Sequence, residues 1–313
     1  MMRHFLRDDD LTPDEQREVL ELALRLKADR FAARPLEGPR AVAVLLDKPT
    51  LRTQLSFAVG IAELGGYPML VDGKLAQIGV RESISDTAKV IGRQVAAVVW
   101  RTYDQSRIDE MAAHAGVPVV NALTDQFHPC QVLADLLTIA EHVGGADGVG
   151  GLPGRTLAYL GDGSNNMAHS YLLGGATAGL HVRIATPAQR MPLPHVVARA
   201  EEIAAVTGGS VLVTESVNEA VAGADAVATD TWVSMGDETS TDKAEALFSA
   251  FRLDAAVLAQ AAPDAVVLHC LPAYRGMEVT ADVLDGPQSV VFDEAENRLH
   301  AQKALLTWLL ERS

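Results

Sequence analysis

The chain has 313 residues, 48% of them apolar and only 5% aromatic, and its formal net charge is −15. Its length favours two domains of roughly 150 residues each. Because phosphate contacts need clustered Lys and Arg, the acidic balance argues against a nucleic-acid-binding protein, although a few local cations could still bind a small anion.

The sequence also lacks the usual marks of a membrane or secreted protein. No apolar run approaches the ~18 residues of a membrane span, and residues 1–4 do not begin the apolar region of a signal peptide. The two cysteines, Cys130 and Cys270, are too few for a disulfide framework. We therefore expect a soluble, cytoplasmic protein with no membrane partner.

The first expected element is a helix that begins after Thr12. Thr12 and Glu15 form a capping-box pair, and Pro13 stands at the first helical position. Apolar residues then recur at helical spacing, at Val19, Leu20, Ala23, Leu24 and Leu26. The pattern predicts a helix packed on one face.

From there on, short apolar runs alternate with amphipathic segments. In the first half we expect strands at 41–46, 67–71, 96–100 and 117–120, and helices at 53–64, 83–93, 106–115 and 129–143. In the second half we expect strands at 156–160, 181–185, 210–214, 225–229 and 265–268, and helices at 166–178, 194–206, 217–222 and 294–310. Such alternation is typical of parallel sheets covered by helices on both faces.

Glycine is dense in residues 144–154, which marks the best candidate domain boundary. We therefore predict an α/β protein of two doubly wound domains with parallel sheets, joined by interdomain helices. The first domain would span 1–145, with the C-terminal helix 294–313 packing back on it, and the second would span 146–293. The polar stretch 234–244 is predicted to be a loop.

Ligands of such folds bind outside the carboxyl ends of the strands. The first expected strand is followed by residues 47–53, where two hydroxyls, Arg52 and the backbone N–H groups of a helix start could form a phosphate cradle. An ordinary capped helix with an exposed arginine is the alternative. Arg101 ends the third strand at the same edge of the sheet, and two arginines there favour an anion site.

Two polar residues surround the start of the helix 129–143. His128 precedes it and Gln131 lies in its first turn. A neutral imidazole at a helix start can polarise a carbonyl oxygen, and a glutamine can bind an amide. A histidine held by a local hydrogen bond is the competing interpretation.

In the second half, Gly161-Asp162-Gly163-Ser164-Asn165-Asn166 resembles a dinucleotide-binding turn, but Asn166 replaces the third glycine, so an NAD-binding oxidoreductase is disfavoured. The two asparagines could cap the helix or bind a zwitterion. Asp230 follows the strand 225–229 and could anchor a ligand amine, or could simply cap a turn.

Cys270 follows the last expected strand. The two cysteines have no close ligand spacing, so metal binding is not expected. His269 and Cys270 are adjacent on an extended chain and point to opposite sides, which makes them a poor catalytic dyad.

Together these segments resemble the transcarbamoylase family of aspartate and ornithine carbamoyltransferases. The resemblance extends from the N-terminal helix to the Glu-Ala-Glu-Asn-Arg-Leu-His segment at 294–300. Its motifs, in family order, are Arg52-Thr53, Gln77-Ile78-Gly79, Trp100-Arg101-Thr102, His128-Pro129-Cys130-Gln131, Ser234-Met235-Gly236 and His269-Cys270-Leu271-Pro272. Six motifs in order are far more specific than any one of them.

The resemblance implies the roles of these residues, without metal or cofactor. Carbamoyl phosphate would bind first, and ornithine second, in arginine metabolism. The phosphate would be held by Thr50, Leu51, Arg52, Thr53 and Arg101. The carbamoyl group would be bound by His128, Gln131, the carbonyl of Cys270 or Leu271, and Arg298. Ornithine would be bound by Asn166, Asp230, Ser234 and Met235. Gln77 would reach in from a neighbouring subunit of a homotrimer, and the Ser-Met-Gly segment would close as a lid.

The implied reaction is direct attack of the ornithine amine on the carbamoyl carbon, which gives citrulline and phosphate. Arg101, His128 and Thr53 would stabilise the charge that develops on the carbonyl oxygen. Asp230 and Cys270 would receive and orient the amine. Closure of the lid would exclude water from the labile phosphate.

One position departs from the family pattern. The phosphate loop usually reads Ser-Thr-Arg-Thr, whereas this chain has Thr50-Leu51-Arg52-Thr53. Leu51 offers only its backbone N–H, so we expect the cradle to survive with weaker affinity for carbamoyl phosphate. The alternatives are a transcarbamoylase for aspartate, putrescine or acetylornithine, and a non-catalytic binding protein that has kept the fold.

Overall fold

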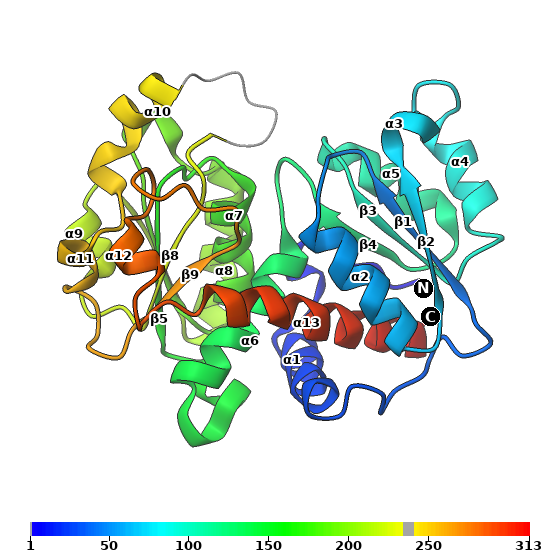
Figure 1. Ribbon diagram of the computed structural model, residues 1–313, viewed down its shortest axis with the longest axis horizontal. Helices are drawn as coiled ribbons and strands as arrows, with labels where there is room; N and C mark the ends of the chain where they lie inside the picture. Colours follow the sequence, from blue (N-terminus) through cyan, green and yellow to red (C-terminus); the bar gives the residue numbers. More distant parts are fainter. Residues whose placement is uncertain (1, 234–240) are drawn as a thin grey trace. The chain divides into compact units, whose positions relative to one another are not determined.

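The computed structural model describes residues 2–233 and 241–313, which form two compact units (Figure 1). Unit 1 comprises Met1–Ala134 and Glu296–Ser313, and unit 2 comprises Asp135–Ala295. Two helices, α6 (Pro129–Val143) and α13 (Val291–Glu311), run from one unit into the other. Within the described parts of the chain, no helix is both long and apolar enough to cross a bilayer.

Unit 1 contains a four-stranded parallel sheet. Its strands are β1 (Ala41–Leu46), β2 (Tyr67–Asp72), β3 (Ala97–Arg101) and β4 (Val119–Leu123), in the order β2-β1-β3-β4. In the inner strands, residues 42–45 of β1 and all of β3 are buried, as expected for aliphatic strands covered on both faces.

Helices cover both faces of this sheet, with α2 (Arg52–Glu63) on one and α4 (Ile84–Ile91) and α5 (Gln105–Ala115) on the other (Figure 1). Unit 1 also contains α1 (Pro13–Ala28) and α3 (Gly73–Ala76), which follows β2 directly. Ala43 and Leu45 of β1 share one core cluster with apolar residues of α4 and α5, and α2 packs outside that cluster. The predicted start of α1 is confirmed, because Thr12 and Glu15 form the capping box.

Unit 2 contains a five-stranded parallel sheet in the order β7-β6-β5-β8-β9. Its strands are β5 (Thr156–Leu160), β6 (His181–Ala185), β7 (Ser210–Thr214), β8 (Ala226–Thr229) and β9 (Val266–His269). Its helices include α7 (Asn166–Ser170), which continues as a π-helix over Tyr171–Gly175, α8 (Pro194–Thr207), α9 (Val217–Val221), α10 (Thr241–Phe248), α11 (Ala255–Leu258) and α12 (Ala281–Leu284). A core cluster joins one face of the sheet to α9, α11 and α12.

The predicted class, two doubly wound domains with parallel sheets, is confirmed, while some element bounds were wrong. The polar stretch 234–244 was predicted to be a loop; residues 234–240 lie outside the described residues, and 241–244 belong to α10, because Ala244 and Phe248 pack one turn apart against Trp232. The last helix begins at Val291 rather than 294, since Val291 is buried in the unit 2 core. In both cases the helix begins where tertiary contacts stabilise it, and these contacts cannot be predicted from the polarity of the local sequence.

Each sheet has one point where the strand order reverses. In unit 1 it lies between β1 and β3, and in unit 2 between β5 and β8. Loops that leave the carboxyl ends of such strand pairs diverge to opposite faces and leave a crevice where ligands bind.

Candidate active site

In unit 1, the strand order reverses between β1 and β3. Leu46 pairs with Arg101, so the chain leaves both strands at the same edge. The next residue, Asp47, is buried and accepts hydrogen bonds from Trp100 Nε1 at 3.1 Å and Thr102 Oγ1 at 2.6 Å. Asp47 therefore holds the two strand ends together beneath the loop 48–53, a role that the sequence interpretation missed.

Four cations of unit 1 act on the imidazole of His128. The side chains of Arg101, His128 and Arg298 are almost fully buried. Burial lowers the pKa of His128 well below its usual value, and the charges of Arg298, Arg101, Arg52 and Lys48 lower it further. The imidazole is therefore neutral at physiological pH, and the cluster of positive charge around it suits an anion.

The candidate phosphate loop, residues 50–53, opens helix α2. The Thr50 hydroxyl accepts a hydrogen bond from the Thr53 N–H at 3.4 Å, and Thr53 Oγ1 accepts one from Arg298 Nη2 at 2.7 Å. Leu51, the residue that departs from the family pattern, points its side chain into solvent and is 74% exposed. Its backbone still lies at the helix start, where free N–H groups favour an anion.

A pocket of about 330 Å³ opens at the ends of β1 and β2. It is lined by Leu46, Asp47, Lys48, Pro49, Thr50, Gln54, Leu70, Val71 and Asp72. The Lys48 ammonium pairs with Asp125 and lies 4.8 Å from the ring centroid of Tyr103. Part of the candidate phosphate loop thus borders a cavity in unit 1.

Gln77 lies in an exposed turn after α3. Its φ of 49° is unusual for a residue with a side chain, and its carbonyl accepts the N–H of Val80 at 3.0 Å. The Ile78 carbonyl accepts a hydrogen bond from Arg107 at 2.8 Å, and Arg107 in turn lies over the Trp100 ring. The turn is therefore anchored to the sheet while Gln77 faces solvent.

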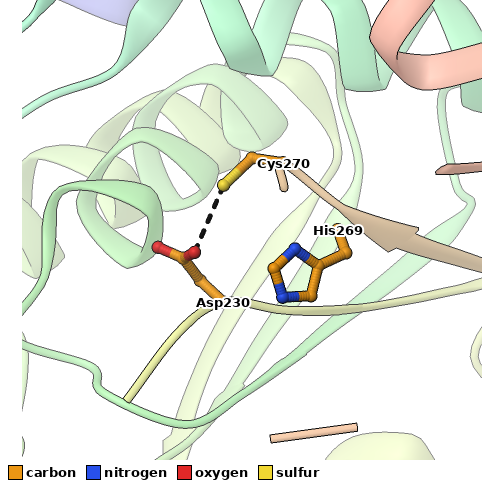
Figure 2. Close-up of side chains that lie close together, drawn as sticks. All are labelled: Asp230, His269 and Cys270. Atoms are coloured by element: carbon orange, nitrogen blue, oxygen red, sulfur yellow. Dashed lines mark hydrogen bonds between the residues drawn. The ribbon is translucent and has the colours of Figure 1, made fainter. Parts of the chain in front are cut away.

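In unit 2, the carboxyl ends of β5, β8 and β9 lie side by side. Leu160 pairs with Thr229, which pairs with His269, so Asp230 and Cys270 leave the sheet side by side. Cys270 Sγ lies 3.2 Å from Asp230 Oδ1 (Figure 2). Burial and the Asp230 carboxylate raise the pKa of the Cys270 thiol well above its usual value, so the thiol stays protonated and is not a ready nucleophile.

The two adjacent asparagines divide their roles. Asn165 caps α7 by accepting the Ala168 N–H at 2.9 Å, and its amide donates to Tyr159 Oη at 2.9 Å and to Asp230 at 3.4 Å. Asn166 begins the helix beside it. Of the two predicted alternatives, capping is therefore confirmed for Asn165, which also donates a hydrogen bond to the Asp230 carboxyl group.

Asp230, His269 and Cys270 each present one possible metal-ligand atom, and these atoms lie within 4.8 Å of one another. Both ring nitrogens of His269 are already engaged, however. Nδ1 accepts the Leu271 N–H at 2.9 Å and Nε2 lies 3.1 Å from Glu278 Oε1. The histidine therefore has no free lone pair for a metal, and the trio is better described as a polar cluster.

The candidate residues thus fall into two groups, one in each unit. In unit 1 these are Thr50, Leu51, Arg52, Thr53, Arg101, His128, Gln131 and Arg298, with Gln77 on its separate turn. In unit 2 these are Asn166, Asp230, Cys270 and Leu271. Ser234, Met235 and Gly236 lie outside the described residues. Asp47 could have been found from sequence, because it follows a strand end as Asp230 does.

The chain matches two family models in succession. Residues 3–141 match the carbamoyl-P binding domain of aspartate/ornithine carbamoyltransferase, and residues 153–309 match the Asp/Orn binding domain of the same family.

Full-length relatives and solved structures agree with these matches. The chain is 61% identical to an ornithine carbamoyltransferase of Clavibacter sepedonicus, with 100% of both chains covered. It is 58% identical to one of Bifidobacterium longum, which covers 98% of this chain and 95% of the relative. The crystal structure of the anabolic ornithine carbamoyltransferase from Campylobacter jejuni is 35% identical, with a TM-score of 0.93 and 100% of both chains covered. The ornithine carbamoyltransferase of Pyrococcus furiosus is 41% identical, with a TM-score of 0.91, and covers 97% of this chain and 96% of its own.

Proposed function

The chain belongs to the aspartate/ornithine carbamoyltransferase family, and from this premise we propose that it carries out the ornithine reaction. It transfers the carbamoyl group of carbamoyl phosphate to the side-chain amine of L-ornithine and releases L-citrulline and phosphate, in arginine biosynthesis. The domain 1–145, with helix 294–313, binds the donor, and the domain 146–293 binds the acceptor. The observation that carries the choice of ornithine is the 61% identity, over the whole chain, to a relative of that name.

The cation cluster of unit 1 supports the donor site. Carbamoyl phosphate carries a dianionic phosphate, and Arg52, Arg101 and the start of α2 offer it charge and N–H donors. His128 is neutral, because burial and four cations oppose its protonation. It can therefore donate a hydrogen bond to the carbamoyl oxygen. The Gln131 side chain can also form a hydrogen bond with the carbamoyl group. Arg298 and Thr53 complete this set through their 2.7 Å hydrogen bond.

The polar cluster of unit 2 supports the acceptor site. Asp230 is a carboxylate at the crevice of the sheet, and a carboxylate attracts an ammonium group and can accept its proton. Cys270 remains a neutral thiol 3.2 Å from Asp230, so it orients an amine without competing as a nucleophile. Asn166, Ser234 and Met235 are assigned to the amino-acid end of ornithine, and the carbonyl of Cys270 or Leu271 to the carbamoyl group.

The chemistry follows from these roles. The neutral amine attacks the carbamoyl carbon, a C–N bond forms, and negative charge develops on the carbonyl oxygen. Arg101, His128 and Thr53 stabilise that charge. The C–O bond to phosphate then breaks, phosphate leaves with the electron pair, and Asp230 takes the proton lost by the amine. No covalent enzyme intermediate is needed.

A homotrimer with shared active sites is part of this proposal. The edge strand β2 exposes Tyr67, Met69 and Leu70, and exposed apolar side chains nearby in the fold of unit 1 include Leu51, Leu55, Leu75 and Val80. A long apolar edge of this kind is unfavourable in water and is suited to burial by a second copy of the chain. Gln77 lies in the same part of the sequence and would enter the neighbouring site.

The protein is assigned to the cytoplasm. Both cysteines are free thiols, in keeping with a reducing compartment. Detection of the tagged full-length protein in the cytosolic fraction of its host would test this assignment.

The deciding assay is colorimetric citrulline production from carbamoyl phosphate and L-ornithine. The purified full-length chain should form citrulline with ornithine and should show little turnover with aspartate, putrescine or acetylornithine at equal concentration. Turnover of one of those three amines in preference to ornithine would overturn the choice of acceptor. No turnover with any amine would overturn the enzymatic proposal itself.

A further inference from the structure

A buried pair that the proposed chemistry does not use lies directly behind Cys270. The side chains of His269 and Glu278 are completely buried, with His269 Nε2 3.1 Å from Glu278 Oε1. On the other side of the ring, Nδ1 accepts the backbone N–H of Leu271 at 2.9 Å. Because Nδ1 accepts, the proton of the neutral ring must be on Nε2, which donates to Glu278.

This pair closes the turn that carries Cys270 and Leu271. Leu271 has a φ of 56°, in the left-handed region that β- and γ-branched residues rarely adopt, so the turn needs support from its surroundings. The support comes from three backbone N–H groups: that of Leu271 donates to His269, that of Tyr274 donates to Glu278 Oε1 at 2.6 Å, and that of His269 donates to Glu294 Oε2 at 2.7 Å.

Glu278 is itself anchored to the rest of unit 2. Its backbone carbonyl accepts a hydrogen bond from the Leu253 N–H at 2.9 Å. The Thr280 N–H, two residues later, donates to the Leu253 carbonyl at 3.0 Å. The turn therefore begins at His269, at the end of β9, and ends at Glu278, and each of these residues is held by backbone hydrogen bonds. The imidazole of His269 links the two ends of the turn through its contact with Glu278. Cys270 is oriented toward Asp230 from this turn (Figure 2).

We propose that His269 and Glu278 are positioning residues for carbamoyl transfer, because they hold the Cys270–Leu271 backbone in the one conformation that aims the thiol and the Leu271 carbonyl at the substrates. The inference rests on the proposed function, which assigns those two groups to the substrates. A buried pair that only stabilised the fold would lower stability without a selective effect on ornithine kinetics.

Two amide variants of His269, each of which keeps one of its two hydrogen bonds, separate these roles. In His269→Asn, the side-chain oxygen replaces Nδ1 and can still accept the Leu271 N–H, whereas in His269→Gln the amide reaches Glu278 and leaves the Leu271 N–H unmet. We expect kcat/KM for ornithine to fall about tenfold to a hundredfold in His269→Gln, the kinetic equivalent of one unmade buried hydrogen bond, and by a smaller factor in His269→Asn, which keeps the Leu271 bond but loses the link to Glu278. The Kd of inorganic phosphate, which binds the residues assigned to unit 1, should stay unchanged in both.

A second pair tests the other end of the link. Glu278→Gln keeps an oxygen that can accept hydrogen bonds from His269 and Tyr274, so its kcat/KM for ornithine should stay within about fivefold of wild type. Glu278→Leu removes this acceptor, so its kcat/KM for ornithine should fall at least about tenfold. Asp225→Ala is the matched stability control, because Asp225 holds Thr156 and Arg155 at the opposite end of the unit 2 sheet. It should lower Tm without changing kcat or KM.

Citrulline formation by the wild-type chain, measured beside these variants, distinguishes failure of the proposed function from failure of the positioning role. With an active wild type, unchanged ornithine kinetics in both His269→Gln and Glu278→Leu would overturn the positioning role. So would a kinetic loss in Asp225→Ala as large as that in His269→Gln. An inactive wild type would instead overturn the proposed function.

Discussion

Arg298 Nη2 donates a hydrogen bond to Thr53 Oγ1 at 2.7 Å, joining residues 245 positions apart in the sequence. Thr53 begins α2 and Arg298 lies on α13, and both side chains are buried in unit 1. The candidate donor site therefore depends on the last helix of the chain as much as on the phosphate loop.

Replacement of Thr53 by valine should weaken donor binding. The change preserves the shape of the side chain but removes one acceptor of a buried guanidinium, a loss of about 1–3 kcal/mol. We expect the Kd of carbamoyl phosphate, measured by calorimetry, to rise about tenfold in Thr53→Val. Thr53→Ser keeps the hydroxyl and is the control. Equal affinity in the valine and serine variants would mean that the hydrogen bond to Arg298 does not shape the site.

Leu51→Thr should restore the hydroxyl that the phosphate loop lacks. Thr is smaller than Leu, so the replacement introduces no steric clash even where a second copy covers this position, and a new neutral hydrogen bond to phosphate contributes about 0.5–1.5 kcal/mol. The KM for carbamoyl phosphate should fall by about twofold to tenfold. Leu51→Ala, which shortens the side chain without adding a donor, should not improve binding. An unchanged KM in Leu51→Thr would mean that the backbone and Arg52 already supply the contact.

The neutral state of His128 predicts how stability depends on pH. Its folded-state pKa is lowered by burial and by Arg298, Arg101, Arg52 and Lys48. The unfolded chain takes up a proton near pH 6.5 and the folded chain does not, so stability is fully present above about pH 6.5 and is lost as the pH falls, by at most about 1.4 kcal/mol per unit. Between pH 7.5 and pH 5, the Tm of the wild type should therefore fall further than that of His128→Asn. Parallel Tm curves for the two proteins would contradict a depressed pKa.

Both cysteines should resist alkylation in the folded protein. Burial raises the pKa of the Cys130 and Cys270 thiols, and the Asp230 carboxylate raises that of Cys270 further. Mass spectrometry after iodoacetamide treatment at pH 8 should detect little modification of the native chain and two modified cysteines after unfolding. Rapid native labelling of Cys270 would show that its thiolate is accessible and would reopen a nucleophilic role.

Shared active sites predict complementation between inactive subunits. Gln77→Ala and Arg101→Ala should each be inactive as homotrimers, because every site would lack one group. When the two proteins are unfolded together and refolded, some sites should combine an intact Gln77 with an intact Arg101 and regain activity. A mixture of two Arg101→Ala preparations, treated in the same way, is the control. No activity in any hybrid would count against the contribution of Gln77 from a neighbour.

The sequence alone was sufficient for the fold class and for much of the local structure. Aliphatic β-branched runs predicted the buried strands of both parallel sheets, and the Thr12–Glu15 pair predicted the start of α1, because these signals are local and depend on side-chain type and spacing. The placement of Arg101, Asp230 and Cys270 at strand ends also follows from local pattern.

Only the tertiary structure decided which of these groups meet. Strand order and register put Asp230 beside Cys270, although 40 positions separate them in the sequence. The same is true of Asp47 with Trp100, of His269 with Glu278 and of Arg298 with Thr53. A hydrogen bond between residues far apart in the sequence produces no periodic sequence pattern. Its two partners are therefore identified only from the tertiary structure, where the donor and acceptor atoms lie about 3 Å apart. For this protein, local sequence pattern specifies the candidate groups, and the fold determines how they are held.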